Sequence, residues 1–311
     1  MKKIIKVVCN YNSDKNIYNI VKDIWYNDEV SKFFELTYQE DYEYLFIIND
    51  YNGNINCKIE NIFGTIQESE ITVKTEELNN YNRNMKNLPN KCNKVFYHNP
   101  DILDSKNIIK SPAFMTHHLW YKPFRGEIQF SENNTQNIIN TNFKKDKKLS
   151  IILNNHDTNS WETKRPMSLY NLRRVFANKL LNSDINFDMY GINWNTNDKR
   201  FKGYIHNKLD GIKNYEYTIC LENCVENGWI TEKFTDSILC KTTPIYYGAK
   251  DVGKYYKNYK YLDIFDNNCI LELKKIINSK RDINFDEDID TYINKNNPFV
   301  YIMSYLKKNE M

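Results

Sequence analysis

The stretch that decides the fold is residues 215–248, YEYTICLENCVENGWITEKFTDSILCKTTPIYYG. An apolar run of strand length is followed by a polar loop, a helix-forming segment, and a second apolar run that ends in Gly. This order is typical of an α/β unit with parallel strands. In such units the loop after the first strand lies at the edge of the sheet where ligands bind. The stretch therefore predicts a binding site built around residues 222–233.

The helix start within this stretch indicates which kind of ligand binds. Thr231 is expected to cap a helix whose first turn holds Glu232 and Lys233. A lysine at this place opposes the helix dipole by about 0.3–1 kcal/mol. An anion bound by the backbone N–H groups and the ammonium would offset that cost, and phosphate is the obvious choice. We interpret Glu226 and Asn227 as loop filler.

Apolar runs alternate with helical periods along the whole chain, which predicts an α/β protein with largely parallel sheets. In the first half, strands are predicted at 4–11, 42–49, 61–66 and 94–99, and a helix at 15–25. In the second half, strands are predicted at 149–155, 185–191, 215–223 and 242–249, and helices at 165–181, 268–279 and 297–308. The polar segment 124–148 ends in lysines and is interpreted as a solvated linker, with a domain boundary at about residue 145.

The composition excludes several classes of protein. The 43 basic and 40 acidic residues among 311 give a net charge of +3, which argues against a nucleic-acid-coating surface. No run approaches the roughly 20 apolar residues of a transmembrane helix, and the N-terminal run is expected to be a strand, not a signal peptide. The seven cysteines lack CxxC spacing, so we expect neither zinc nor disulfides, and a cytoplasmic location. The oligomeric state is left open.

Residues 219–249, ICLENCVENGWITEKFTDSILCKTTPIYYGA, resemble the donor-binding signature of the family-10 glycosyltransferases, the α-1,3/α-1,4-fucosyltransferases. The family pattern runs Phe-Glu-Asn, a short loop, Gly-Tyr-(Val/Ile)-Thr-Glu-Lys, a helix, then Pro-(Ile/Val)-Tyr-Trp-Gly. This chain departs from it at Leu221, Trp229 and Tyr247. Upstream, RRVFANKLLNSDINFDMYG at 173–191 resembles the arginine helix and Val-Asp-Val-Tyr-Gly of the family. The resemblance covers about 149–262, and the first half matches loosely.

The resemblance implies a GT-B fold, in which two Rossmann-like domains face each other across a cleft. It implies an inverting transfer of fucose from GDP-fucose to a hydroxyl of a glycan or glycoconjugate, without a metal or another cofactor. Residues 1–145 would bind the acceptor and residues 146–295 the donor. Residues 296–311 would form a C-terminal helix that packs back on the first domain.

The resemblance also assigns roles to single residues. Lys233 and an arginine of the 166–181 helix would hold the diphosphate, and counting back from Gly191 without gaps selects Arg174 over Arg173. Glu232 would bind the ribose. The other donor-binding residues implied are Tyr190, Glu222, Asn223, Trp229 and Thr231. The catalytic base would be Glu68 in NIFGTIQESE (61–70), with Glu70 as the alternative.

Two alternatives remain at this point. The same fold could use another nucleotide-activated deoxy-sugar, or the chain could be an inactive relative that binds glycans. The acidic run Asp286–Asp290 is interpreted as a charged surface and not as a metal site. Lys233 and Arg174 with a helix N-terminus could neutralise a departing diphosphate instead. The acceptor and the linkage stay undetermined.

Overall fold

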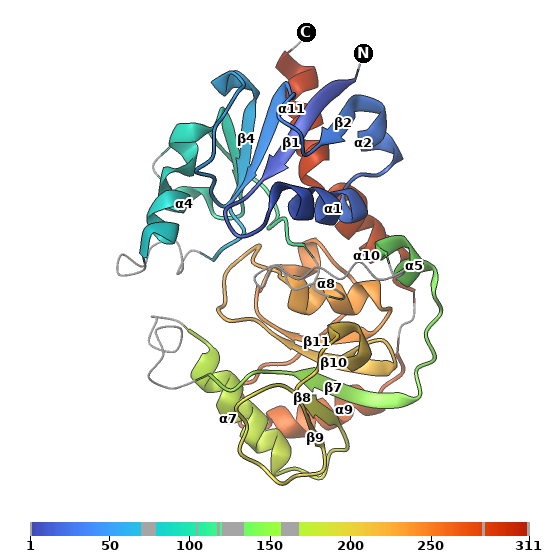
Figure 1. The fold of residues 1–311 in the computed structure, drawn as a ribbon. Helices are drawn as coiled ribbons and strands as arrows, with labels where there is room; N and C mark the ends of the chain where they lie inside the picture. The colour runs from blue at the N-terminus through green and yellow to red at the C-terminus, as the bar shows by residue number, and fades with distance from the viewer. Residues whose placement is uncertain are drawn as a thin grey trace.

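The computed structural model describes residues 2–69, 79–103, 105–116, 119, 134–156, 168–281 and 284–309. Within these residues the chain forms two sheets, one above the other in Figure 1, and every strand pair in both sheets is parallel. The first sheet has the order β2-β1-β3-β4-β5-β6 and the second the order β12-β11-β10-β7-β8-β9. The predicted α/β class with two Rossmann-like domains is confirmed.

The strands of the first sheet are β1 (Lys3–Val8), β2 (Phe34–Thr37), β3 (Tyr44–Ile48), β4 (Ile62–Thr65), β5 (Lys94–Tyr97) and β6 (Ile108–Lys110). Those of the second are β7 (Lys147–Ile152), β8 (Asp188–Tyr190), β9 (Phe201–Gly203), β10 (Tyr215–Leu221), β11 (Thr243–Tyr247) and β12 (Lys260–Tyr261). The strands that sequence patterns miss are the short ones, because two to four residues carry too little periodicity.

The helices that cover the first sheet include α1 (Asp14–Ile24), α2 (Asp28–Phe33) and α4 (Asn79–Lys91), and α5 (Thr135–Asn140) follows them along the chain. Those of the second half are α7 (Tyr170–Leu181), α8 (Glu232–Leu239), α9 (Cys269–Asn278), α10 (Asp286–Asp290) and α11 (Pro298–Asn309). Helix α1 illustrates why an apolar period in the sequence predicts a helix. The Ser13 side chain caps its first turn by accepting from the backbone N–H of Asn16, and its apolar face is buried.

The second sheet carries the site described below, and its central strands are buried throughout. Strand β10 lies between β7 and β11, so both of its edges are paired, and all of its residues except Glu216 are buried. Its hydrogen-bond register sets Tyr217 opposite Thr243 and Leu221 opposite Tyr247. The C-terminal ends of β10 and β11 are thereby level, so the loops that follow them start side by side.

Helix α11 returns to the first domain after the second is complete. The ring of Phe299 lies 6.0 Å from that of Phe34 and 5.9 Å from that of Phe46, measured between centroids. The ring of Tyr305 lies 5.7 Å from that of Phe63. Residues 298–309 are therefore part of the core of the first domain, and Figure 1 shows both ends of the chain at that domain.

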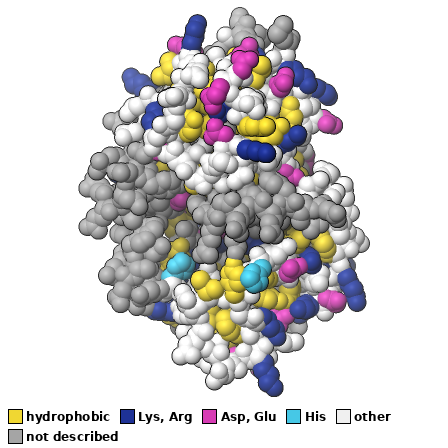
Figure 2. All heavy atoms as spheres, viewed as in Figure 1, with side chains coloured by type: hydrophobic (Ala, Val, Ile, Leu, Met, Phe, Trp, Pro, Cys, Tyr) yellow, Lys and Arg dark blue, Asp and Glu magenta, His cyan; other side chains and the backbone are white. Residues whose placement is uncertain are grey.

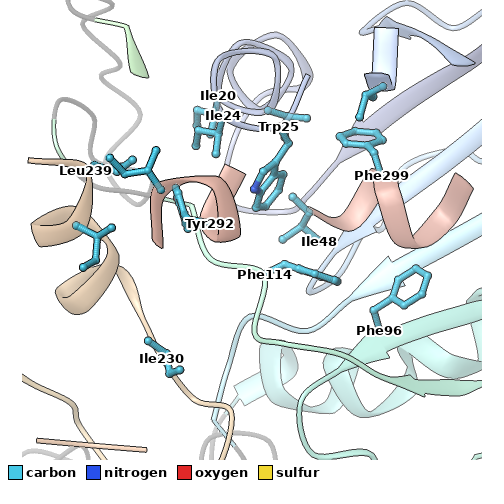
Figure 3. Packing of buried hydrophobic residues seen from close by; sticks show 14 of the residues in the cluster. Ile20, Ile24, Trp25, Ile48, Phe96, Phe114, Ile230, Leu239, Tyr292 and Phe299 are labelled. Carbon is cyan, nitrogen blue, oxygen red and sulfur yellow. The ribbon is translucent and has the colours of Figure 1, made fainter. Parts of the chain in front are cut away.

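The two domains share an apolar core on one side (Figure 3). Ile230 and Leu239 of the second domain belong to the same buried cluster as Ile24 and Trp25 of the first. Tyr292, on the segment that leads to α11, lies among them and donates from its hydroxyl to the carbonyl of Met115 at 3.0 Å. This packing holds the C-terminal edges of the two sheets facing each other.

The lysines before β7 are not all solvated, which corrects the prediction of a linker there. Lys144 is exposed, but the Lys145 ammonium donates to the carbonyls of Lys213 and Cys240 and to the hydroxyl of Thr242, at 2.6–2.7 Å. Cys240 is the C-cap of α8. Lys145 thus ties the segment between the domains to the end of that helix.

The outer surface carries both signs of charge. On the face drawn in Figure 2, Lys and Arg side chains are interspersed with Asp and Glu. In the part of the chain that the structure describes, no helix combines the length and the apolar character that crossing a bilayer requires.

Candidate active site

Glu222 is the buried anchor of the site. It follows directly after β10, and its side chain is fully buried. Its Oε1 accepts from the backbone N–H of Thr231 and its Oε2 from the hydroxyl of the same residue, both at 2.8 Å. Burial raises the pKa of Glu222, and the nearby Lys233 and the two hydrogen bonds from Thr231 oppose that shift. The carboxylate therefore supports the loop from beneath, which corrects its prediction as a donor-binding residue.

Gly248 makes this close packing possible. A Cβ at this position would lie 2.4 Å from Cγ of Glu222 and 2.4 Å from the hydroxyl oxygen of Tyr246. Both are closer than real Cβ contacts, and Tyr246 is itself fully buried. The Gly at the end of the second apolar run is therefore needed for space, not for backbone conformation.

Thr231 caps helix α8 as the sequence predicts. Its backbone is extended, and its Oγ1 accepts from the backbone N–H of Lys233 at 3.4 Å. The same oxygen donates to Glu222, so the start of the helix is fixed to the end of β10. Thr231 is 1% exposed, so it too supports the site from below.

Lys233 and Glu232 lie above this anchor. The Lys233 Nζ is 3.1 Å from Glu232 Oε1, 3.6 Å from Glu222 Oε2 and 3.0 Å from Thr231 Oγ1. Burial opposes the charge of Lys233, but the carboxylates of Glu232 and Glu222 raise its pKa. The raised pKa keeps the lysine charged. Its side chain is 27% exposed, so a ligand can reach it.

Arg173 is the arginine that the structure brings to this cluster, and the choice of Arg174 is corrected. Arg173 is 6% exposed and lies within electrostatic range of Glu222, Glu232 and Lys233. Burial lowers its pKa, against the attraction of the Glu222 and Glu232 carboxylates. Arg174 turns outward and donates to Asn171 at 3.3 Å. One residue along a helix is a rotation of about 100°, which separates the two side chains.

Within the part of the chain that the structure describes, the guanidinium of Arg173 lacks hydrogen-bond partners that its burial calls for. Its Nε and Nη1 are buried and donate to no acceptor among the described residues. Its Cζ lies 4.9 Å from the ring centroid of Tyr170, so the plane is held by stacking. Buried guanidinium N–H groups are normally satisfied, so these are the groups of the site that most call for an anionic ligand.

Asn223 and the buried Trp229 connect the loop after β10 to α7. The indole N–H of Trp229 donates to Asn223 Oδ1 at 3.0 Å, and the carbonyl of Asn223 accepts from the backbone N–H of Leu169 at 2.8 Å. Leu169 is the N-cap of α7. The loop of residues 223–230, which we call the donor loop after its predicted role, and the helix that carries Arg173 are therefore fixed to each other.

Tyr190 is bonded to residues outside the cluster, so its predicted part in donor binding stays a prediction. Its hydroxyl is 2.8 Å from that of Tyr215, which in turn donates to Asp188 at 2.7 Å. Tyr215 begins β10, whereas Glu222 follows the end of the same strand. The Tyr190 hydroxyl is thus engaged with the residue that begins β10, although Tyr190 itself ends β8, level with Ile152 of β7.

Glu68 lies in the first domain, three residues after β4, and is half-buried. Its carbonyl accepts from the hydroxyl of Tyr97 at 3.0 Å. The neighbouring Ser69 side chain lies close enough to the Cys224 thiol to oppose the rise that burial causes in the pKa of that thiol. Segment 67–69 therefore lies against the donor loop across the domain boundary. The alternative base, Glu70, lies outside the described residues.

Glu226 is not loop filler, which corrects that interpretation. Its Oε1 lies 2.6 Å from Nε2 of His98, in the first domain. The sequence gives no sign of this contact, because the two residues are 128 positions apart. Asn227, by contrast, is exposed as expected.

The acidic run at 286–290 is not simply a charged surface. Asp288 is 1% exposed and accepts from the backbone N–H groups of Lys257 and Asn258. Its carboxylate therefore fixes a turn of the second domain. Among the described residues, no group of three or more His, Cys, Asp or Glu is arranged to hold a metal ion.

Comparisons with known proteins show which family this chain resembles. Residues 143–287 match the model of the family described as glycosyltransferase family 10 (fucosyltransferase) C-term. The chain is also 32% identical over 65 residues to the alpha-(1,3)-fucosyltransferase FucT of Helicobacter pylori. That match covers 21% of this chain and only 14% of the relative. The resemblance inferred from residues 219–249 is confirmed.

Two solved structures share the fold over nearly the whole chain. A crystal structure of an alpha1,3-fucosyltransferase with GDP aligns with a TM-score of 0.52 at 16% identity, covering 98% of this chain and 89% of that one. A structure with GDP-fucose aligns with a TM-score of 0.51 at 16% identity, covering 99% and 90%. At identities this low, the structural match shows the fold alone. The predicted GT-B arrangement is thereby confirmed.

Proposed function

We propose that this chain is an inverting glycosyltransferase that moves fucose from GDP-fucose to a hydroxyl of a glycan or glycoconjugate. The observation that carries the proposal is the buried Arg173 guanidinium, with two groups unpartnered among the described residues, in electrostatic range of Lys233 at the start of α8. The family-10 match over 143–287 supports fucose as the sugar. The neighbours solved with GDP and GDP-fucose support the nucleotide.

The two cations suit a departing diphosphate. As the bond between the sugar C1 and the phosphate oxygen breaks, negative charge grows on the GDP that leaves. Arg173 can donate two parallel hydrogen bonds to phosphate oxygens, and Lys233 supplies a compact charge beside it. Groups that are fixed in place before the reaction stabilise such charge strongly, because they need no reorganisation. In this proposal the clamp needs no metal ion.

The acceptor side completes the reaction. The acceptor hydroxyl oxygen forms a bond to C1 on the face opposite the diphosphate, and C1 inverts as GDP leaves with the bonding electrons. The hydroxyl proton passes to the Glu68 carboxylate, which acts as the general base. Ser69, beside it, contacts the donor loop, which supports a position of Glu68 facing the donor across the cleft.

Calorimetric titration with nucleotides tests the donor assignment. We expect GDP and GDP-fucose to bind, and UDP and dTDP to bind far more weakly. The Arg174→Ala variant is the control, since its side chain turns away from the cluster. Tight binding of UDP or dTDP with none of GDP would overturn the nucleotide. If GDP binds but a different deoxy-sugar is transferred, the assignment of fucose as the sugar is wrong and that of GDP as the nucleotide stands.

Lys233→Ala tests the clamp and separates an enzyme from an inactive glycan-binding relative. We expect a loss in kcat of about 10²-fold or more, because one charge contact with the leaving group is removed. A wild-type chain that releases no GDP with any acceptor glycan of an array would favour the inactive relative. Undiminished transfer by the variant would remove Lys233 from the mechanism.

A further inference from the structure

We propose that His98 is a positioning residue, which with Glu226 docks the donor loop (residues 223–230) onto the first domain and so holds Trp229 in place. The contact between the two side chains crosses the domain boundary. His98 follows β5 of the first sheet and Glu226 lies in the loop after β10 of the second. The consequence for the donor rests on the proposed function, whereas the docking itself does not.

The polar contact is short and buried. His98 Nε2 and Glu226 Oε1 are 2.6 Å apart, and their side chains are 0% and 8% exposed. The amide of Asn99 donates to the same carboxylate oxygen at 3.4 Å. A carboxylate accepts, so Nε2 carries the proton, and Nδ1 is buried without a partner among the described residues. The neutral tautomer with Nε2–H therefore leaves no buried N–H unsatisfied.

The ring of His98 also packs against the donor loop. Its centroid lies 5.2 Å from that of Trp229, with an angle of 37° between the planes. Gly228 lets the loop pass close to the histidine, because a Cβ there would be 3.2 Å from Cβ of His98. Its φ of +75° is also one that favours glycine. The backbone, the indole and the carboxylate of the loop thus all meet one side chain.

The contacts of the loop explain why this docking affects the donor site. Trp229 bonds to Asn223, and Asn223 in turn fixes the start of the helix that carries Arg173. A second contact across the boundary, from Ser69 to Cys224, lies at the same edge. The geometry of the donor pocket therefore depends on a side chain of the domain that faces it.

Hydrogen exchange measured by mass spectrometry tests the docking without any ligand. In His98→Ala we expect amides of 224–230 to exchange about tenfold faster or more, while α9 is unchanged. His98→Gln should exchange like the wild type, because its side-chain amide can donate to Glu226 from nearly the position of Nε2. His206→Ala is the matched control, since that histidine is exposed and contacts Tyr204 in the second domain.

Steady-state kinetics test the effect on the donor. In His98→Ala we expect KM for GDP-fucose to rise about tenfold with a smaller change in kcat, because the donor loop is misplaced while the clamp is intact. Glu226→Ala should do the same, and the double variant should be no worse than either single one. His98→Gln should restore KM.

Three results would overturn the proposal or part of it. Unchanged exchange of 224–230 in a folded His98→Ala chain would remove the docking. Faster exchange in His98→Ala with an unchanged KM for GDP-fucose would remove the positioning role. Additive effects of the two single variants would mean that the side chains act separately. A wild-type chain that binds no GDP would overturn the proposed function, while the exchange experiment would still decide the docking.

Discussion

The two facing edges of the molecule are built in opposite ways. The edge of the second sheet takes nearly all of its site from one contiguous segment, 222–233, with charged side chains at its centre. The edge of the first sheet is assembled from the ends of separate strands, where amides lie beside the Asp50–Lys91 ion pair. There the Asn49 side chain accepts from the backbone of Gln67, and the Gln67 amide donates to the carbonyl of Phe114.

The difference matches the chemistry proposed for the two substrates. A nucleoside diphosphate carries fixed charge, which calls for cations held in a defined arrangement. A glycan hydroxyl is neutral, so its binding calls for amides, hydroxyls and one base. A local motif can encode the first kind of site, whereas the second depends on how distant strand ends meet. The experiments below test this contrast, starting with the largest effect.

Glu68→Gln tests the edge of the first sheet. The variant keeps the shape of the side chain but cannot take a proton, so we expect kcat to fall about 10²- to 10⁴-fold. Nucleotide binding should be unchanged, as measured by calorimetry. Glu60→Gln, at an exposed position before β4, is the control. Full activity of Glu68→Gln would mean that the base lies elsewhere, and Glu70 would be the next residue to change.

Arg173→Ala and Arg174→Ala together test the charged edge. The first removes the buried guanidinium, and we expect kcat to fall about 10²- to 10³-fold. The second removes a side chain bonded only to Asn171 among the described residues, and it should behave like the wild type. Steady-state rates of both variants decide the assignment. A large loss of kcat in Arg174→Ala with none in Arg173→Ala would restore Arg174 as the arginine of the clamp.

Glu222→Ala tests the support beneath the charged edge. The variant leaves the backbone N–H and the hydroxyl of Thr231 buried without their acceptor, so the free energy of unfolding should fall by about 1–3 kcal/mol. Chemical denaturation measures this loss. Glu216→Ala, on the same strand, removes only a partly exposed pair with Lys148 and should cost at most about 1 kcal/mol. Equal losses would mean that Glu222 is not the anchor.

Removal of metal ions is expected to have the smallest effect. If Arg173 and Lys233 neutralise the leaving group, treatment with EDTA should leave the transfer rate unchanged, and added Mg²⁺ should not raise it. The measurement is GDP release before and after dialysis against the chelator. A rate that collapses with EDTA and returns with a divalent ion would show that the two cations are not sufficient.

Where a signal is local, the sequence was enough to predict the structure. The central strands, the cap at Thr231 and the pairing of β10 with β11 depend on neighbouring residues and on the buried character of parallel strands. The choice between Arg173 and Arg174 failed because a helix turns by about 100° per residue. A count along the chain cannot fix that rotation, whereas the packing of α7 does.

Two other errors have different causes. Glu222 was assigned to the donor site from the family resemblance, and its full burial depends on the space left by Gly248, 26 positions further on. Glu226 was set aside because its partner His98 comes from the other domain. Contacts of that kind have no local pattern, so they become visible only once both sheets are placed.

The return of α11 also bears on the order in which the protein forms during synthesis. One buried cluster of the second domain is built wholly from residues between Leu149 and Ile277. The core of the first domain, by contrast, needs Phe299 and Tyr305 beside Phe34 and Phe63. On the ribosome this one cluster of the second domain can therefore form before residues 298–309 emerge, although it is encoded later than most of the first domain. The first domain must wait, with part of its apolar surface uncovered, until residues 298–309 emerge.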